Sequence, residues 1–304
     1  MIKENKVPFA LPRILAWEVT RRCPLKCKHC RAGAADVVFA NELTTDECLK
    51  VIDSLPKMMI IWTGGEPMSR PDILTLVKRA TERGIRSVMA PCGLMVTHES
   101  LKALKDAGVM ACSFSLDGPD KETHDAFRGV DGAYDQILAA MRVASDIGMP
   151  FQINTTVSKL NKDRLDEIYA KALEMGASKL DLFFLVPVGR GKGISQFALS
   201  DDETKAVLDW AFDKAEEGVI DIKETCCPSA PAYCAATRVG SKHRPSGCLG
   251  GRGFSFLSHT GNLQTCGFID IPCGNIRDYD FDFPSMIANA TNPLGQCGTC
   301  RGIK

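Results

Sequence analysis

The chain has 304 residues, a length that suits one large domain or one domain with a small appendage. Apolar residues make up 45% of the sequence and charged residues 24%, a balance typical of globular proteins with a sizeable core. Lys plus Arg and Asp plus Glu both number 37, so the chain lacks the basic excess of a general nucleic-acid binder.

The 14 cysteines are the unusual feature of the composition. In a small secreted chain, such a number would indicate a framework of disulfide bonds. This chain is larger, and its first residues, Met1–Arg13, lack the apolar core of a signal peptide. Its longest apolar runs, such as Met58–Trp62 and Leu182–Val188, are far too short to span a membrane. We therefore expect a cytoplasmic protein without a membrane partner, whose cysteines carry metal or redox chemistry.

Apolar runs alternate with amphipathic helix patterns over the first two thirds of the chain. The predicted strands are Ile14–Thr20, Met58–Thr63, Ser87–Pro91, Met110–Leu116, Phe151–Val157 and Leu180–Pro187. The predicted helices cover 44–55, 71–83, 97–107, 133–148, 163–175 and 203–217. This series of βα units predicts an α/β fold with a parallel sheet and helices outside it, an open and partial (β/α)6 TIM-like barrel. We expect its chemistry at the C-terminal ends of the strands.

The pattern changes after residue 217, where Pro and Cys become frequent. The alternation at Gly253–Phe256 predicts a strand, and His259–Asn262 predicts the turn of a β-hairpin. We therefore expect a core domain at residues 1–217 and a small Cys-rich extension, which contains the hairpin, at residues 218–304.

Three cysteines, Cys23, Cys27 and Cys30, directly follow the first predicted strand in a C-x3-C-x2-C spacing. Iron–sulfur clusters are held by cysteine thiolates, normally four for a four-iron cluster. Three thiolates leave one metal position open to a substrate or cofactor, as a catalytic zinc site does. A structural zinc site is the alternative interpretation, although such sites usually combine two C-x2-C halves.

This motif, placed after the first strand of a partial barrel, resembles the radical S-adenosylmethionine (SAM) superfamily. The resemblance implies that the three cysteines hold a [4Fe–4S] cluster whose open iron binds SAM. It also implies reductive cleavage of SAM to a 5′-deoxyadenosyl radical. The segment Thr63–Pro67, with the sequence TGGEP, follows the second strand as a similar segment does in the family. The residues that match SAM-binding positions of the family are Gly64, Gly65, Glu66, Pro67, Ser115, Arg128, Asn154 and Leu185.

The later cysteines resemble the SPASM or twitch extension of the same superfamily, which holds auxiliary iron–sulfur clusters. Cys248 and Cys266 are spaced as C-x12-G-x4-C, and Cys297 and Cys300 form a C-x2-C pair. By the same resemblance, Cys226 is an added ligand. The family pattern continues with further cysteines after the C-x2-C pair, but this sequence has none after Cys300. We therefore expect one auxiliary cluster at most.

Longer phrases of the sequence resemble the heme b synthases of the siroheme-dependent alternative heme pathway. These phrases are AWEVTRRC at 16–23, CKHCRA at 27–32, QINTTV at 152–157, LVPVGRGK at 185–192, GCLGG at 247–251 and FLSHTG at 256–261. The resemblance implies a tetrapyrrole substrate, with oxidative decarboxylation of two propionates of iron-coproporphyrin III to vinyl groups. Arg190 and Lys192 are candidate partners of the substrate carboxylates, and Cys92 is a candidate substrate contact.

Basic residues surround the cysteine motif. They are candidate contacts for substrate carboxylates or for an acidic flavodoxin- or ferredoxin-type electron donor, and they comprise Arg21, Arg22, Lys26, Lys28 and Arg31. Three alternative functions remain open at this point. The first is another radical SAM enzyme that removes side chains from heme-like tetrapyrroles, and the second is a SPASM-type peptide-modifying maturase. The third is a non-catalytic iron–sulfur carrier or zinc-binding module, which would not cleave SAM.

Overall fold

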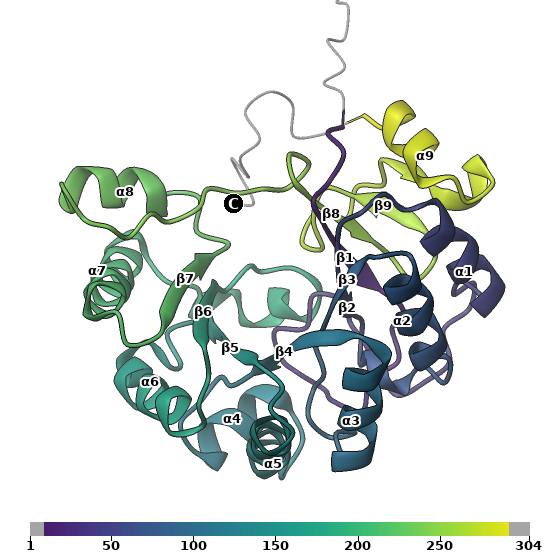
Figure 1. Cartoon of the computed structure of the whole chain (residues 1–304). Helices are drawn as coiled ribbons and strands as arrows, with labels where there is room; N and C mark the ends of the chain where they lie inside the picture. Colours follow the sequence, from purple (N-terminus) through teal and green to yellow (C-terminus); the bar gives the residue numbers. More distant parts are fainter. Residues whose placement is uncertain (1–8, 292–304) are drawn as a thin grey trace, which may run out of the picture.

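The structure, a computed structural model, describes residues 9–291 of the chain. Its strands join in one sheet with the hydrogen-bonded order β10-β9-β8-β1-β2-β3-β4-β5-β6-β7. The strands are β1 (Ile14–Glu18), β2 (Met59–Thr63), β3 (Arg86–Met89), β4 (Val109–Ser115), β5 (Phe151–Val157), β6 (Lys179–Phe184), β7 (Asp221–Thr225), β8 (Phe254–Leu257), β9 (Asn262–Gln264) and β10 (Gly274–Asn275). Strands β1 to β7 are parallel, and the sheet curves without closing (Figure 1). The predicted open α/β barrel is confirmed.

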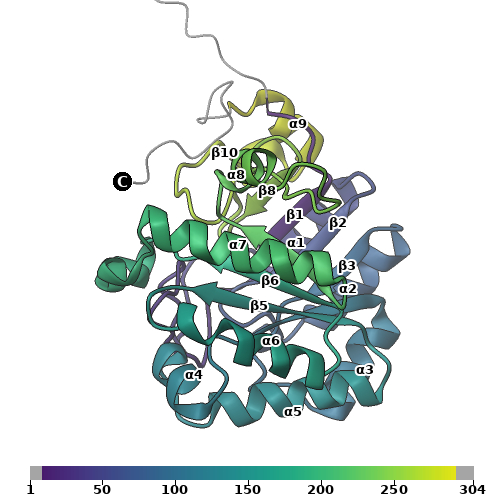
Figure 2. The same ribbon diagram turned by 90° about the vertical axis from the view of Figure 1, so that its left-hand side faces the viewer.

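Helices lie around the outer side of the curved sheet. The α-helices are α1 (Thr45–Ser54), α2 (Ile73–Glu82), α3 (His98–Ala107), α4 (Lys121–Arg128), α5 (Ala133–Asp146), α6 (Leu165–Glu174), α7 (Asp201–Glu217), α8 (Ala230–Thr237) and α9 (Phe283–Asn289). Short 3-10 helices occur at η1 (Pro67–Ser69), η2 (Lys162–Arg164), η3 (Gly189–Phe197) and η4 (Ile276–Tyr279). Figure 2 shows α6 and α7 in front of β5 and β6. Among the described residues, no helix combines the length and apolar character that a membrane span requires.

Local signals in the sequence set the ends of several helices. The side chains of Thr44, Thr97 and Ser200 accept hydrogen bonds from the N–H groups three residues later in α1, α3 and α7. In each case the side chain of that later residue bonds back to the N–H of the capping residue. Gly108 ends α3 with a φ of +113°, and a Cβ at this position would meet the side chain of Thr81. These signals explain the agreement between the predicted and observed helices.

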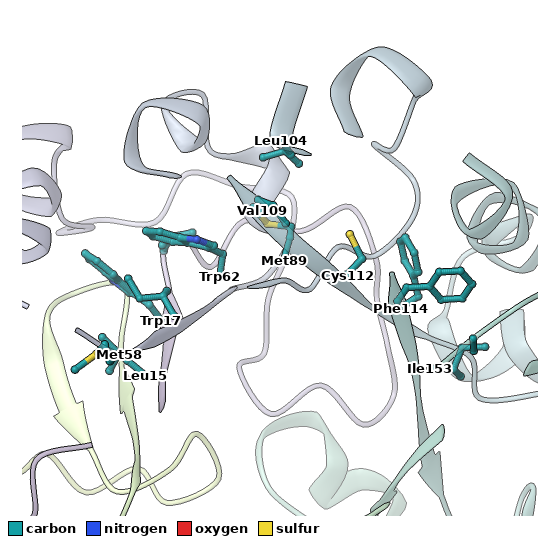
Figure 3. Packing of buried hydrophobic residues seen from close by; sticks show 14 of the residues in the cluster. Leu15, Trp17, Met58, Trp62, Met89, Leu104, Val109, Cys112, Phe114 and Ile153 are labelled. Carbon is teal, nitrogen blue, oxygen red and sulfur yellow. The ribbon is translucent and has the colours of Figure 1, made fainter. Parts of the chain in front are cut away.

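The main core lies between the sheet and the helices. Trp17 of β1 and Trp62 of β2 are fully buried and stack with their ring centroids 5.6 Å apart. The indole N–H of Trp62 donates to Ser87 Oγ at 3.0 Å. Phe114 of β4 packs edge-on against Phe151 of β5, with ring centroids 5.5 Å apart. Figure 3 shows this layer of apolar side chains, which fixes the strands whose ends form the candidate site.

The opposite face of the sheet is more polar and less covered. Along β5, buried side chains alternate with the half-buried side chains of Gln152, Asn154 and Thr156. Successive side chains of a strand point to opposite faces, so these three share the face away from the apolar core. Side chains that contact a ligand inside the barrel therefore come from this second face.

Two elements of the barrel were not predicted from the sequence. In β7, charged residues alternate with the buried Ile222 and Glu224, so the strand lacks the apolar run that marked the other parallel strands. Helix α4 is mostly polar, and it buries only His124, Phe127 and Arg128. Its start is fixed by Asp120, whose carboxylate accepts from the N–H of Thr123 at 2.9 Å.

The predicted hairpin is formed by the antiparallel strands β8 and β9. Strand β8 also pairs in parallel with β1, with Ile14 opposite Phe254 and Trp17 opposite Leu257. The hairpin therefore extends the sheet beyond β1. Strands β7 and β8 both lie after residue 217, and the division of the chain near that residue stays a prediction.

Candidate functional site

The candidate site lies at the C-terminal ends of β1 to β6, where the loops carry most of the residues selected from the sequence. Cys23, Cys27 and Cys30 follow β1, and the segment Thr63–Pro67 ends β2 and enters the following loop. Arg190 follows β6. In parallel α/β sheets these strand ends meet at one edge, which is where ligands bind.

The three cysteines lie in the loop after β1. Cys23 and Cys27 are each only 7% exposed, and Cys30 is half-buried. Apolar residues, including Leu25 and Ala34, pack around them. The N–H of Cys30 donates to the carbonyl of Cys27 at 3.2 Å, which places these two residues on the same tight turn. Three thiols in an apolar setting near the surface suit iron–sulfur ligation.

In the described part of the chain, no three His, Cys, Asp or Glu side chains converge on the position of a single metal ion. The thiolates of a four-iron cluster bind different irons and are therefore spread around the cluster. The donor set of Cys23, Cys27 and Cys30 fits such a cluster.

Two glycines after β2 allow this loop to approach the cysteine loop. The N–H of Gly65 donates to the carbonyl of Thr20 at 2.8 Å, and the N–H of Glu66 donates to the carbonyl of Arg22 at 2.7 Å. A Cβ at Gly64 would lie 2.5 Å from the carbonyl oxygen of Thr20, and a Cβ at Gly65 would overlap that of Arg22. The glycines therefore serve the contact between two backbone segments.

Glu66 connects the loop after β2 to the loop after β3. Its carboxylate is fully buried and accepts the N–H of Met68 at 2.8 Å and that of Cys92 at 2.5 Å. Burial raises the pKa of Glu66, against the effect of these hydrogen bonds. The Glu66 carboxylate thus has its hydrogen-bond partners within the protein.

The Cys92 thiol lies beside Cys23, and the hydrogen bond between the two thiols lowers the pKa of Cys23.

Helix α4 supports the other side of the cysteine loop. The N–H groups of Lys26 and Lys28 donate to the carbonyls of Arg128 at 3.2 Å and Phe127 at 2.9 Å. The ring of His29 stacks on that of Phe127, with centroids 4.4 Å apart. Burial lowers the pKa of His29 to about 4, so its imidazole is neutral near pH 7. The loop is therefore held by backbone contacts on both sides of Cys27.

Arg128 lies next to Cys27 in a buried ion pair. Its Nη2 is 2.6 Å from Asp117 Oδ2, and its Nη1 donates to Cys27 Sγ at 3.8 Å. Asp117 is fully buried, and its other oxygen accepts the N–H of Thr156 at 2.7 Å. Burial raises the pKa of Asp117, but the charge of Arg128, with smaller contributions from His29, His124 and the Thr156 N–H, keeps that pKa below its ordinary value. The Nε of Arg128 is buried without a hydrogen-bond partner in the described structure.

Ser115 and Asn154 lie opposite each other on the adjacent strands β4 and β5, and both are half-buried. The side-chain oxygen of Asn154 accepts a hydrogen bond from Gln152 at 2.7 Å. Leu185 follows β6, where its N–H donates to the carbonyl of Val157 at 3.1 Å. The structure therefore places Ser115, the last residue of β4, beside Asn154 in the middle of β5.

The two cations after β6 differ in their surroundings. Arg190 is half-buried, and its guanidinium donates to backbone carbonyls of the cysteine loop. Lys192 is exposed. The sequence assigned both residues to substrate carboxylates, whereas the geometry shows Arg190 in contact with the protein itself.

The structure brings two of the later cysteines together. A Cβ at Gly250 would lie 3.5 Å from Cys248 Sγ and 3.8 Å from Cys266 Cβ, so both cysteines flank this glycine. Cys226 follows β7, the strand at the opposite end of the sheet order, and it has a φ of +63°. The remaining predicted ligands, Cys297 and Cys300, lie outside the described residues.

A charged network at the end of β1 was missed by the sequence analysis. Glu18 is fully buried and accepts hydrogen bonds from Arg21 Nε at 3.2 Å and Arg31 Nη1 at 3.0 Å. The guanidinium of Arg31 also lies 4.3 Å from the centre of the Phe256 ring of β8. Glu18 is a lone acidic residue within an apolar strand. This signal could have indicated the network, because a buried carboxylate requires partners.

Known proteins resemble this chain in sequence and in fold. A family model described as the radical SAM superfamily matches residues 17–172, about half of the chain. The AdoMet-dependent heme synthase of Nitratidesulfovibrio vulgaris is 39% identical over an alignment that covers 95% of this chain and 84% of that protein. The enzyme of the same name from Methanosarcina barkeri is 38% identical, with 95% and 88% covered. The solved structure of Streptococcus suis SuiB bound to its precursor peptide SuiA has a TM-score of 0.74. It covers 99% of this chain and 70% of that chain at 16% identity, a likeness that concerns the fold alone.

Proposed function

We propose that this chain, which belongs to the radical SAM superfamily, converts iron-coproporphyrin III to heme b by oxidative decarboxylation of two propionate side chains. Membership of the family implies SAM and a [4Fe–4S] cluster as cofactors. The observation that carries the proposal is the loop with Cys23, Cys27 and Cys30, in a chain that matches two AdoMet-dependent heme synthases over 95% of its length.

Cys23, Cys27 and Cys30 are the proposed cluster ligands. When bound, the cluster and SAM supply the radical that removes hydrogen from an unreactive carbon. The chain contributes the apolar surroundings of the thiols and the positive charge of Arg128 beside Cys27 Sγ. Burial raises the pKa of the Cys27 thiol, and the Arg128 cation opposes this rise and so favours the thiolate form, which is the form that binds iron.

The SAM site is proposed at the loops after β2 and β6, the last residue of β4, the middle of β5 and the last residue of α4. Its residues are Gly64, Gly65, Glu66, Pro67, Ser115, Arg128, Asn154 and Leu185. The carbonyls of Gly64 and Gly65 are the proposed contacts of this segment with SAM. The Glu66 carboxylate accepts the N–H groups of Met68 and Cys92, and the N–H groups of Gly65 and Glu66 donate to the cysteine loop. Ser115 and Asn154 contribute side chains from neighbouring positions of β4 and β5.

The proposed substrate explains the polar residues near the site. Each propionic acid group becomes a vinyl group with the loss of one CO2 and two hydrogen atoms, so a carbon–carbon bond breaks and the side chain is oxidised. Lys192 is exposed in η3, after β6, and suits a substrate carboxylate. Cys92 is a further proposed substrate contact, on the loop after β3.

The electrons require a donor and an acceptor. The exposed Lys26 and Lys28 flank Cys27 and suit the surface of an acidic flavodoxin- or ferredoxin-type donor. Cys248 and Cys266 are proposed ligands of an auxiliary iron–sulfur cluster, together with Cys226, Cys297 and Cys300. Such a cluster provides electron transfer when bound.

The test is an anaerobic reaction of the reconstituted chain with SAM, a reductant and iron-coproporphyrin III. Mass spectrometry is expected to show 5′-deoxyadenosine and a product that has lost two CO2 and four hydrogen atoms. Cys27→Ala is expected to abolish both products, whereas Cys112→Ala, which removes a buried core thiol of β4, is expected to retain them. Formation of 5′-deoxyadenosine without any change in the tetrapyrrole would disprove the substrate assignment. Turnover of a precursor peptide instead would identify a peptide-modifying maturase.

A further inference from the structure

The loop after β6 packs directly on the cysteine loop through Arg190. Its Nε donates to the carbonyl of Cys27 at 2.8 Å, and its Nη1 donates to the carbonyl of Ala34 at 2.6 Å. The backbone N–H of Arg190 donates to the carbonyl of Cys30 at 3.0 Å. One residue therefore contacts three carbonyls of the segment that contains two of the three proposed cluster ligands.

The residue before Arg190 shows how close the two loops are. Gly189 has a φ of +55°, a conformation that favours glycine. A Cβ at this position would lie 2.5 Å from the carbonyl oxygen of Cys30 and would overlap that of Arg31. These neighbours are backbone atoms, so they cannot move aside as a flexible side chain can. The contact is thus a backbone-to-backbone contact that Gly189 permits and Arg190 fixes.

The carbonyls that Arg190 contacts also belong to the turns of the cysteine loop. The carbonyl of Cys27 accepts the N–H of Cys30 at 3.2 Å, and the carbonyl of Cys30 accepts the N–H of Gly33 at 3.4 Å. Both turn bonds are long for N–H···O bonds. The charged guanidinium adds shorter bonds to the same loop, and hydrogen bonds from charged donors are the stronger kind.

We propose that Arg190 is a positioning residue, which holds the turn from Cys27 to Ala34 in the shape that presents Cys27 and Cys30 to the cluster. This role deepens the proposed function and rests on it for the identity of the bound group. Arg190 then acts on the cysteine loop and leaves substrate carboxylates to the exposed Lys192. Lysine is a poor replacement, because the bonds to Cys27 and Ala34 come from two different nitrogens of a rigid, planar guanidinium, whereas lysine offers a single nitrogen on a flexible chain.

The first test measures hydrogen exchange in the metal-free full-length chain, so it needs no cofactor or substrate. Arg190→Lys is expected to raise the exchange rate of backbone amides between Cys27 and Ala34 by about tenfold, as loss of charge-assisted hydrogen bonds would. Arg83→Lys is the matched control, since Arg83 also donates to a backbone carbonyl, that of Asp53 at 2.9 Å. This control bond joins α2 to α1, away from the site, and exchange in the cysteine loop is expected to stay unchanged.

The second test compares iron content and kinetics after anaerobic reconstitution. Arg190→Lys is expected to bind less iron per chain and to lose SAM cleavage in proportion, with an unchanged KM for iron-coproporphyrin III in the loaded fraction. Lys192→Gln is expected to show the opposite split, with normal iron content and a raised KM.

Unchanged loop exchange in Arg190→Lys would overturn the positioning role, whatever the iron content. Normal iron content with a raised KM would assign Arg190 to the substrate instead. Failure of the tetrapyrrole reaction in the unmodified chain would contradict the proposed function while leaving the exchange result valid, so the two failures are distinguishable.

Discussion

The ring of His259 donates a hydrogen bond from Nδ1 to the carboxylate of Glu18 at 2.8 Å, across 241 positions of sequence. Both residues are buried, and the same carboxylate binds Arg31 of the cysteine loop. Burial raises the pKa of Glu18, but the charge of Arg31 and the hydrogen bond from His259 lower it to about 2. An ionised carboxylate only accepts hydrogen bonds, so Nδ1 carries the proton. Glu18 thus joins β1, the cysteine loop and the β8–β9 turn.

Replacing Glu18 with Gln is expected to reduce the free energy of unfolding by about 3 kcal/mol, because removal of one partner of a buried ion pair leaves the other uncompensated. Urea unfolding under reducing, anaerobic conditions measures this loss. Glu167→Gln provides a control on the surface of α6, where little change is expected. Equal stability of the two variants would contradict the role of Glu18.

The contribution of Glu18 should depend on pH in a defined direction. Its pKa in the folded chain, about 2, lies below the ordinary value of 4.5. A group with a lowered folded pKa stabilises the fold above its unfolded pKa and loses this contribution as the pH falls toward the folded pKa. The stability difference between the unmodified chain and Glu18→Gln is therefore expected to be full above pH 4.5 and to shrink between pH 4.5 and 2. A difference that grew on acidification would have the wrong sign.

The ion pair between Asp117 and Arg128 predicts a strongly non-additive double-mutant cycle. Asp117→Asn leaves the Arg128 charge buried without its partner, and a loss of about 3–5 kcal/mol in unfolding free energy is expected. The double variant Asp117→Asn/Arg128→Met is expected to lose less than the sum of the two single variants. Additive losses would show that the two side chains do not depend on each other.

Gly65→Ala is expected to be disruptive because the added Cβ overlaps the carbonyl of Arg22 in the cysteine loop. Forced displacement in a packed region costs about 1–3 kcal/mol, and the displaced loop should also bind less iron. Gly193→Ala is the matched control, since no atom lies within 4 Å of a Cβ at that position. Thermal unfolding and iron content measure both effects, and normal iron in Gly65→Ala would contradict the close contact.

Cys248→Ser and Cys266→Ser test the auxiliary site. If both thiols hold a second cluster, each variant is expected to bind less iron than the unmodified chain and to retain SAM cleavage at the first cluster. Cys112→Ser is the control, because this thiol is buried in the main core and contacts Met149 Sδ at 3.2 Å. Iron content equal to that of the unmodified chain in both variants would rule out an auxiliary cluster at this place.

Sequence patterns predicted what depends on local spacing. The apolar runs predicted six of the parallel strands and the amphipathic patterns predicted helices. Thr44, Thr97 and Ser200 cap three of these helices through hydrogen bonds that reach only three residues. The cysteine spacing and the TGGEP segment pointed to the edge where the structure places them. The SAM and cluster contacts of these residues stay predictions.

The rest depends on contacts that no local pattern contains. Arg190 contacts the carbonyl of Cys27, which is 163 positions away and is a backbone atom that any residue supplies. The charge of Arg190 and its place after β6 predicted a substrate contact, and nothing in the sequence indicated the backbone contact. Strand β7 escaped prediction because its buried residues include Glu224, which pairs with His243 at 3.0 Å. A strand with a buried carboxylate can be predicted only when the partner of that carboxylate is known.

The pairing of β1 with β8 has a consequence for synthesis of the protein. Strand β1 emerges first from the ribosome, and β2 can pair with one of its edges early. Its other edge waits for β8, which begins only at Phe254. An apolar strand with an unpaired edge is a template for pairing with other chains. We therefore expect nascent chains interrupted before Phe254 to aggregate. We also expect the 304-residue chain to need chaperones during its translation, even if it is stable once folded.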